Sequence, residues 1–157
     1  LPNPELSLNE IDIIKKFVNI TFPINGNIPL GISDRCFFLD ELKLEGDCET
    51  LCAKPHWLKQ DNWQLGEIGR APISGKELCM AEYFLDLIKK GYRYFYIYGL
   101  KRDESYLASV SSIYKDLGSG SIDSVYAVEK LNELAKFGLC NGYFFGQSGN
   151  LYITKDK

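Results

Sequence analysis

The pattern of hydrophobic and polar positions predicts a chain that mixes strands with helices. Residues 92–98 read YRYFYIY, with a tyrosine at every second position. In an extended strand these side chains, Tyr92, Tyr94, Tyr96 and Tyr98, share one face. Arg93, Phe95 and Ile97 point to the other face, and the composition of the strand favours a central position with both of its faces covered.

Helix start and stop signals predict about four helices. Two capping boxes of the form Ser-x-x-Glu, at residues 7–10 and 74–77, are each followed by apolar residues at helical spacing. Two further helices are expected, one capped by Asp103 or Ser105 and the other by Asp123, and a glycine ends each of them.

The remaining stretches are predicted as loop, strand and hairpin. Residues 23–33 are rich in Pro, Gly and Asn, which is typical of a loop, and residues 34–47 favour a strand. Residues 47–73 have no sustained period, so we expect irregular structure there with a short helix or strand. Residues 139–154 predict a C-terminal hairpin.

These elements indicate a single α+β domain over residues 1–157, with a small mixed or antiparallel sheet and a sub-boundary near residues 70–74. Residues 74–157 also follow the element order of a winged-helix domain, which stays open as an alternative. We favour one sheet in which the tyrosine strand and the hairpin join the N-terminal strand. The tyrosine strand is longer and more apolar than a winged helix needs.

Composition and charge favour a protein partner over nucleic acid. The formal net charge is −3, whereas binding to a phosphate backbone needs clustered Lys and Arg. Residues 34–49 hold six acids against two bases. We therefore expect an acidic surface that binds a partner with a basic face, with the four tyrosines as anchors. The predicted acidic contacts are Asp34, Asp40, Glu41, Glu45, Asp47 and Glu49.

The chain shows no stretch of about 18 apolar residues that would span a membrane, and its N-terminus lacks the pattern of a signal peptide. Its five cysteines are an odd number without the spacing of a disulfide framework. We therefore expect reduced thiols and a cytoplasmic protein.

The predicted function is non-enzymatic binding. The most concrete form is an inhibitor or immunity-type protein that neutralises a basic partner, such as a nuclease toxin, through residues 34–49. This hypothesis depends on the placement of charge and on the lack of a recognisable catalytic motif, and it involves no cofactor and no metal.

One alternative is a nucleic-acid-binding protein, either of winged-helix type or one that holds a single strand by stacking and by charge. The second form would use the basic residues that flank the tyrosines, namely Lys89, Lys90, Arg93, Lys101 and Arg102.

The other alternative is a small hydrolase that uses His56, the single histidine, or the carboxylates of residues 34–47. His56 could pair with one of the five thiols as a nucleophile. The spacing Cys48-x3-Cys52-x3-His56 could also supply ligands to a structural zinc ion, with a fourth from Cys36, Cys79 or an acid.

Overall fold

The structure is a computed structural model, and it describes residues 1–53, 55–61 and 63–155. Six strands form one sheet: β1 (Thr21–Pro29), β2 (His56–Gln60), β3 (Trp63–Glu67), β4 (Pro72–Cys79), β5 (Tyr94–Tyr98) and β6 (Leu139–Cys140). The α-helices are α1 (Leu8–Ile14), α2 (Cys48–Leu51), α3 (Ala81–Lys89), α4 (Glu104–Ser119) and α5 (Ser124–Leu134). A π-helical turn, η1 (Phe37–Glu41), and a 3₁₀ turn, η2 (Gly142–Phe145), complete the list.

The strands lie in the order β2-β3-β4-β1-β5, and β6 pairs with β4. Pairing is antiparallel between β2, β3, β4 and β1, and parallel between β1 and β5 and between β4 and β6. The mixed sheet confirms the predicted α+β class. The winged-helix alternative for residues 74–157 is wrong, because β5 pairs with β1 from the N-terminal half and both belong to one sheet.

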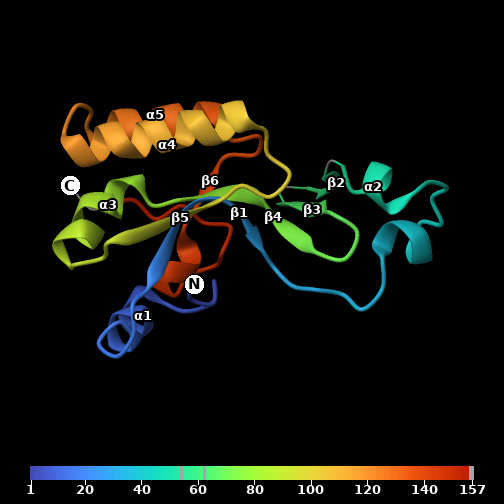
Figure 1. Cartoon of the computed structure of the whole chain (residues 1–157), viewed down its shortest axis with the longest axis horizontal. Helices are drawn as coiled ribbons and strands as arrows, with labels where there is room; N and C mark the ends of the chain where they lie inside the picture. Colours follow the sequence, from blue (N-terminus) through green and yellow to red (C-terminus); the bar gives the residue numbers. More distant parts are fainter. Residues whose placement is uncertain (54, 62, 156–157) are drawn as a thin grey trace.

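Helices α4 and α5 lie side by side over one face of the sheet, and α1 lies on the opposite side (Figure 1). The core fills the space between the sheet and its helices. Leu78 of β4, Phe84 of α3, Leu117 of α4 and Leu131 of α5 are buried in one apolar cluster. Each such side chain contributes about 1.5–3 kcal/mol by its removal from water.

The predicted loop at residues 23–33 is wrong, because most of it is β1. Its asparagines are buried polar residues with specific partners. The Asn25 side-chain amide donates to the Tyr106 hydroxyl at 3.0 Å, and the Asn27 amide donates to the Ser74 carbonyl at 2.8 Å. Hydrogen bonds to distant residues thus stabilise a polar sequence in the middle of a sheet.

Three other predictions need correction. Residues 34–47 do not form a strand; they contain η1, whose buried residue is Phe38. Residues 47–73, which were expected to be irregular with one short element, form α2 and the β2–β3 hairpin. The C-terminal hairpin is replaced by β6, which runs parallel to β4, and by η2.

Three of the four predicted helix N-terminal signals are confirmed, and one is wrong. The Ser7 capping box is confirmed, and Asp103 and Asp123 cap α4 and α5 by accepting a backbone N–H three residues ahead. The second capping box is wrong, because Ser74 lies in β4 and its hydroxyl accepts from the Ile28 N–H at 2.8 Å. Within the described residues, every helix is too short or too polar to cross a bilayer.

Candidate nucleic-acid interface

A cavity of about 560 Å³ lies where β2 meets the segment that follows β5. Its lining residues are Trp57 of β2, the last three residues before α4 (Lys101, Arg102 and Asp103), Lys136 after α5, Ala53 and Pro55. We call it the Trp57 cavity. It lies beyond the carboxyl end of β5.

One aromatic ring, that of Trp57, lines this site, and the Phe137 ring supports it. Trp57 packs edge to face with Phe137, with ring centroids 4.9 Å apart. The indole also lies over Gly66 of the neighbouring strand, where an added Cβ would approach it to 2.9 Å. The Lys136 ammonium is 5.1 Å from the Trp57 ring, and the Lys59 ammonium is 4.9 Å from the Phe137 ring. Both distances are within the range of cation–π attraction.

Arg102 connects the cavity to the interior. Its Nη2 donates to the Glu77 carboxylate and, at 2.9 Å, to the Asn27 side-chain oxygen. Its guanidinium lies over the Tyr106 ring at 4.4 Å. The Glu77 side chain is 1% exposed and the Arg102 side chain is 20% exposed, so Arg102 is the member of this ion pair that reaches solvent.

The charges of this network are tightly balanced. Burial raises the pKa of Glu77, while the hydrogen bond from Tyr106 and the charge of Arg102 act in the opposite direction. The Tyr106 hydroxyl donates to the same carboxylate at 2.5 Å, and burial together with that carboxylate raises the pKa of Tyr106. Glu77 therefore serves as a fixed internal anchor for Arg102.

The surface around the cavity is positive although the whole chain is acidic. Lys101, Lys136 and Arg102 line it. The one acid among its lining residues is Asp103, which accepts the Tyr106 N–H at 2.8 Å as the N-cap of α4. Hydrogen bonds from Tyr106 and Ser105 hold the pKa of Asp103 below its usual range.

Sequence reasoning found only part of this site. Lys101 and Arg102 belonged to the basic cluster proposed for the single-strand alternative, but Trp57, Lys59 and Lys136 were missed. The spacing Trp57-x-Lys59 places both residues on one face of a strand. That signal was available, but residues 47–73 were not expected to contain two paired strands.

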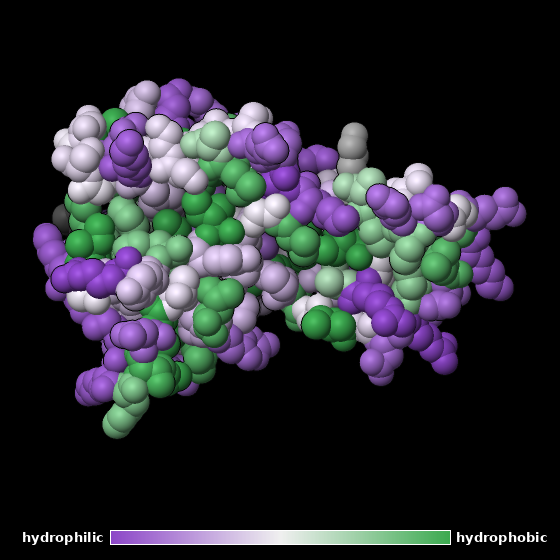
Figure 2. Space-filling view, viewed as in Figure 1, coloured by the Kyte–Doolittle hydropathy of each residue, from purple (hydrophilic) through white to green (hydrophobic). Residues whose placement is uncertain are grey.

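The predicted acidic residues of segment 34–49 are all exposed: Asp34, Asp40, Glu41, Glu45, Asp47 and Glu49. Hydrophilic side chains cover much of the end of the molecule that carries η1 and α2 (Figure 2). Several of these acids have local structural roles. Asp40 accepts the Cys36 N–H at 2.7 Å, and Asp47 caps α2 through the Thr50 N–H.

Asp34 and Glu41 line a second cavity, of about 390 Å³, together with Glu67 of β3, a residue that sequence reasoning did not select. Burial raises the pKa of Glu67. Across the described parts of the chain, no three His, Cys, Asp or Glu side chains are grouped so that they could bind a metal ion.

The four tyrosines do not share one environment. Tyr92 is buried and donates its hydroxyl hydrogen to Asp12 at 2.8 Å, and Tyr98 is buried at the end of β5. Tyr94 and Tyr96 are 61% and 39% exposed. The expectation of a central strand is wrong, because β5 is the last strand of the sheet order.

His56 does not meet a thiol in the described structure. Its Nε2 lies 3.2 Å from the Leu51 carbonyl oxygen, and its ring packs against Phe38 at 4.3 Å. Burial raises the pKa of Cys79 to about 11 and that of Cys140 to about 12, so both are inert thiols at neutral pH. The arrangement needed by the thiol–imidazole hypothesis is therefore missing from the described residues.

The thiols of Cys36 and Cys48 lie near Cys52. Burial, followed by the influence of these two neighbours, raises the pKa of Cys52. Such a shift stabilises the protonated thiol, which is the less reactive form.

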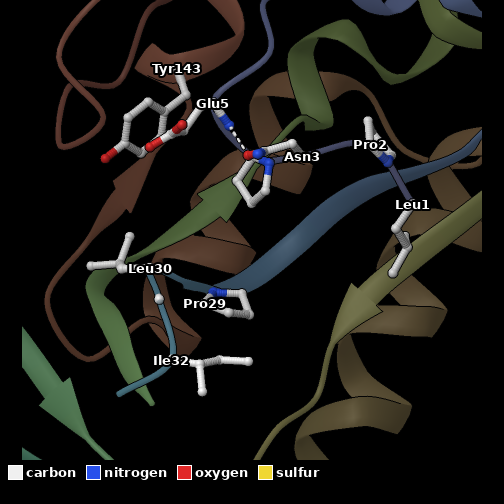
Figure 3. Close-up of a pocket in the computed structure, with 10 residues that line it drawn as sticks. Leu1, Pro2, Asn3, Glu5, Pro29, Leu30, Ile32 and Tyr143 are labelled. Carbon is white, nitrogen blue, oxygen red and sulfur yellow. Dashed lines mark hydrogen bonds between the residues drawn. The ribbon is translucent and has the colours of Figure 1, made fainter. Parts of the chain in front are cut away.

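A further cavity, of about 720 Å³, lies between the N-terminal residues and the segment after β1. Its wall combines apolar residues, Leu1, Pro2, Pro29 and Ile32, with polar ones, Asn3, Glu5 and Tyr143 (Figure 3). Its one charged side chain is Glu5, whose backbone N–H donates to the Asn3 side chain at 3.0 Å. This cavity therefore has fewer charged lining residues than the Trp57 cavity, which has four.

Comparison with known proteins places these observations in context. Residues 3–153 match the family described as peptidase family U32. The chain is 26% identical over 138 residues to a 23S rRNA 5-hydroxycytidine C2501 synthase of Escherichia coli. The match covers 84% of this chain and 20% of that protein, so the chain spans one fifth of the length of this relative. No solved structure matches.

These similarities contradict the predicted non-enzymatic function. The matched family is named for peptidases and the matched relative is a synthase, so both point to enzymes rather than to an immunity protein or toxin inhibitor. The exposed acids had suggested a binding surface, but acids on loops and caps are also a common way to keep a protein surface hydrated.

Proposed function

We propose that this chain, which belongs to peptidase family U32, is part of an enzyme that acts on RNA and that the Trp57 cavity holds a single strand of that RNA. The relative named above is a 23S rRNA 5-hydroxycytidine C2501 synthase, and this supports RNA as the substrate class. Nucleic acid, set aside on the basis of overall charge, thus becomes the favoured partner.

The observation that carries the proposal is the combination of rings and cations at one place. Trp57 and Phe137 lie beside Lys59, Lys101, Arg102 and Lys136. Single-stranded nucleic acid is typically held by aromatic rings on which bases stack and by cations that follow the phosphates. The chain as a whole carries a net charge of −3. The local excess of positive charge therefore arises because the fold brings these cations together at one place.

The experiment measures how binding of a short single-stranded RNA, about ten nucleotides long, depends on salt, by fluorescence anisotropy. For single strands, the slope of log K against log salt is about −0.7 for each phosphate contact. Removing two contacts with Lys101→Ala/Lys136→Ala should therefore make the slope shallower by about 1.4.

A matched control removes two exposed lysines elsewhere, Lys16→Ala/Lys115→Ala. Both double variants have the same net charge. The proposal requires that only the cavity variant changes the slope. Equal slopes in the two variants, or an unchanged slope in both, would show that the Trp57 cavity is not the RNA site.

A further inference from the structure

Arg102 is held in place before any ligand arrives. A guanidinium has five N–H donors in a rigid planar fork, and in this structure one of its nitrogens, Nη2, makes the contacts with Glu77 and Asn27. The Tyr106 ring supports the guanidinium plane from one side. Glu77, Asn27 and Tyr106 are 1%, 5% and 8% exposed, so all three supports are buried.

The backbone adds to this arrangement. Lys101 has φ of +58°, a left-handed conformation that is uncommon for a residue other than glycine. The Arg102 N–H closes the turn on the Gly99 carbonyl at 3.1 Å. As a result, consecutive basic residues, Lys101 and Arg102, line the same cavity.

Phosphate is the ligand group that fits an Arg with its orientation fixed and with two lysines nearby. Arg binds phosphate oxygens through parallel N–H bonds, and a pre-oriented fork loses less side-chain freedom on binding. The volume of about 560 Å³ lies within the roughly 300–1,000 Å³ that is common for small-molecule sites. It leaves room for more than a phosphate group.

We infer that the Trp57 cavity binds one nucleotide unit of the RNA, with Arg102, Lys101 and Lys136 on its phosphate and the Trp57 ring against its base. This inference deepens the proposed function and depends on it. Glu77 has the part of a positioning residue, since it is buried and acts on the ligand only through Arg102.

The test uses intrinsic fluorescence. The sequence has two tryptophans, so Trp63→Phe leaves Trp57 as the single reporter. The probes are cytidine 5′-monophosphate, cytidine and inorganic phosphate. We expect saturable quenching by the nucleotide, and an affinity for the nucleotide about tenfold or more above that for cytidine, since charge-assisted contacts to phosphate are the stronger ones.

Arg102→Lys, made in the Trp63→Phe protein, keeps the positive charge but removes the planar set of guanidinium donors. It should reduce the preference for nucleotide over cytidine to about threefold or less. Glu77→Gln should reduce the same ratio, while the affinity for cytidine stays unchanged. A general loss of structure would lower both affinities together, so the ratio separates positioning from folding. Arg70→Lys, at an exposed arginine, is the matched control.

If either core variant fails to fold by circular dichroism, Lys136→Gln on the surface replaces it and should lower the nucleotide affinity severalfold. An absence of quenching by the nucleotide, or an unchanged ratio in Arg102→Lys, overturns the inference. When the salt slope of RNA binding still depends on Lys101 and Lys136, that failure leaves the proposed function standing. If the nucleotide is not preferred and the salt slope does not depend on Lys101 and Lys136 either, both the inference and the proposed function are rejected.

Discussion

The ion pair between Glu77 and Arg102 allows a prediction about stability. Arg102→Ala leaves the Glu77 carboxylate, 1% exposed, without its positive partner. Removing one member of a buried pair costs about 3–5 kcal/mol of unfolding free energy. The Tyr106 hydroxyl still donates to this carboxylate, so we expect the lower end, about 3 kcal/mol. For a chain of this size, that corresponds to a melting temperature lower by about 6–12 °C.

The cost should depend on pH in a definite direction. The pKa of Glu77 is raised in the folded protein, so stability falls as the pH rises from the ordinary carboxyl value toward this raised value. The charge of Arg102 lowers the pKa of Glu77, so removing Arg102 raises the pKa of Glu77 further. The pH range over which stability is lost then extends to higher pH. The penalty of Arg102→Ala is therefore largest near neutral pH and disappears below the pKa of the unfolded chain, where Glu77 is protonated in both states.

The assay is urea unfolding of wild type and Arg102→Ala at about pH 7 and about pH 4.5, with the linear extrapolation of the unfolding free energy. The double variant Glu77→Gln/Arg102→Ala, in which no charge is left buried, serves as the control and should be more stable than Arg102→Ala at neutral pH. A cost below about 1 kcal/mol at pH 7, less than the range for a broken buried pair, or a cost that does not shrink at low pH, would refute this reasoning.

Two further predictions concern the backbone and the helix cap. Gly26 has φ of +104°, and an added Cβ would lie 2.2 Å from the Tyr98 carbonyl oxygen, whereas Gly120 has φ of +78° with open space around it. Gly26→Ala should therefore cost about 2–4 kcal/mol and Gly120→Ala about 1 kcal/mol in urea unfolding; equal costs would exclude the clash. Asp103→Ala should lower the thermal midpoint by removing the α4 cap and should also tighten RNA binding by removing the acid of the Trp57 cavity. A variant that is less stable and binds RNA more weakly would contradict the second half.

The features predicted correctly are those whose signals are local. Ser7, Asp103 and Asp123 each bond a backbone N–H three residues away, so a short stretch of sequence contains both partners. The same reasoning failed at β1, because the hydrogen-bond partner of Asn25 is Tyr106, 81 positions away. A polar stretch with such distant partners cannot be distinguished from a loop on composition.

The candidate site was missed for a related reason. Trp57, Arg102 and Lys136 come from three separated parts of the chain, and their meeting depends on the sheet order. The acidic segment stood out because its residues are adjacent in sequence, and adjacency is what a reading of one sequence detects best. The tyrosines show the same limit: alternation predicted strand β5, but only the sheet order shows that it lies at the edge.

The position of β1 in the sheet has a consequence for how the molecule forms during synthesis. The two neighbours of β1 are β4 and β5, and both are later in the chain. During synthesis β1 is therefore made before either of its neighbours, and residues 30–71 must follow before β4 begins. Such long-range pairings form slowly and leave apolar surface exposed in the meantime. Until β4 and β5 have been made, β1 has no partner in the sheet, and its apolar side chains such as Phe22 and Ile24 cannot yet be buried in the core.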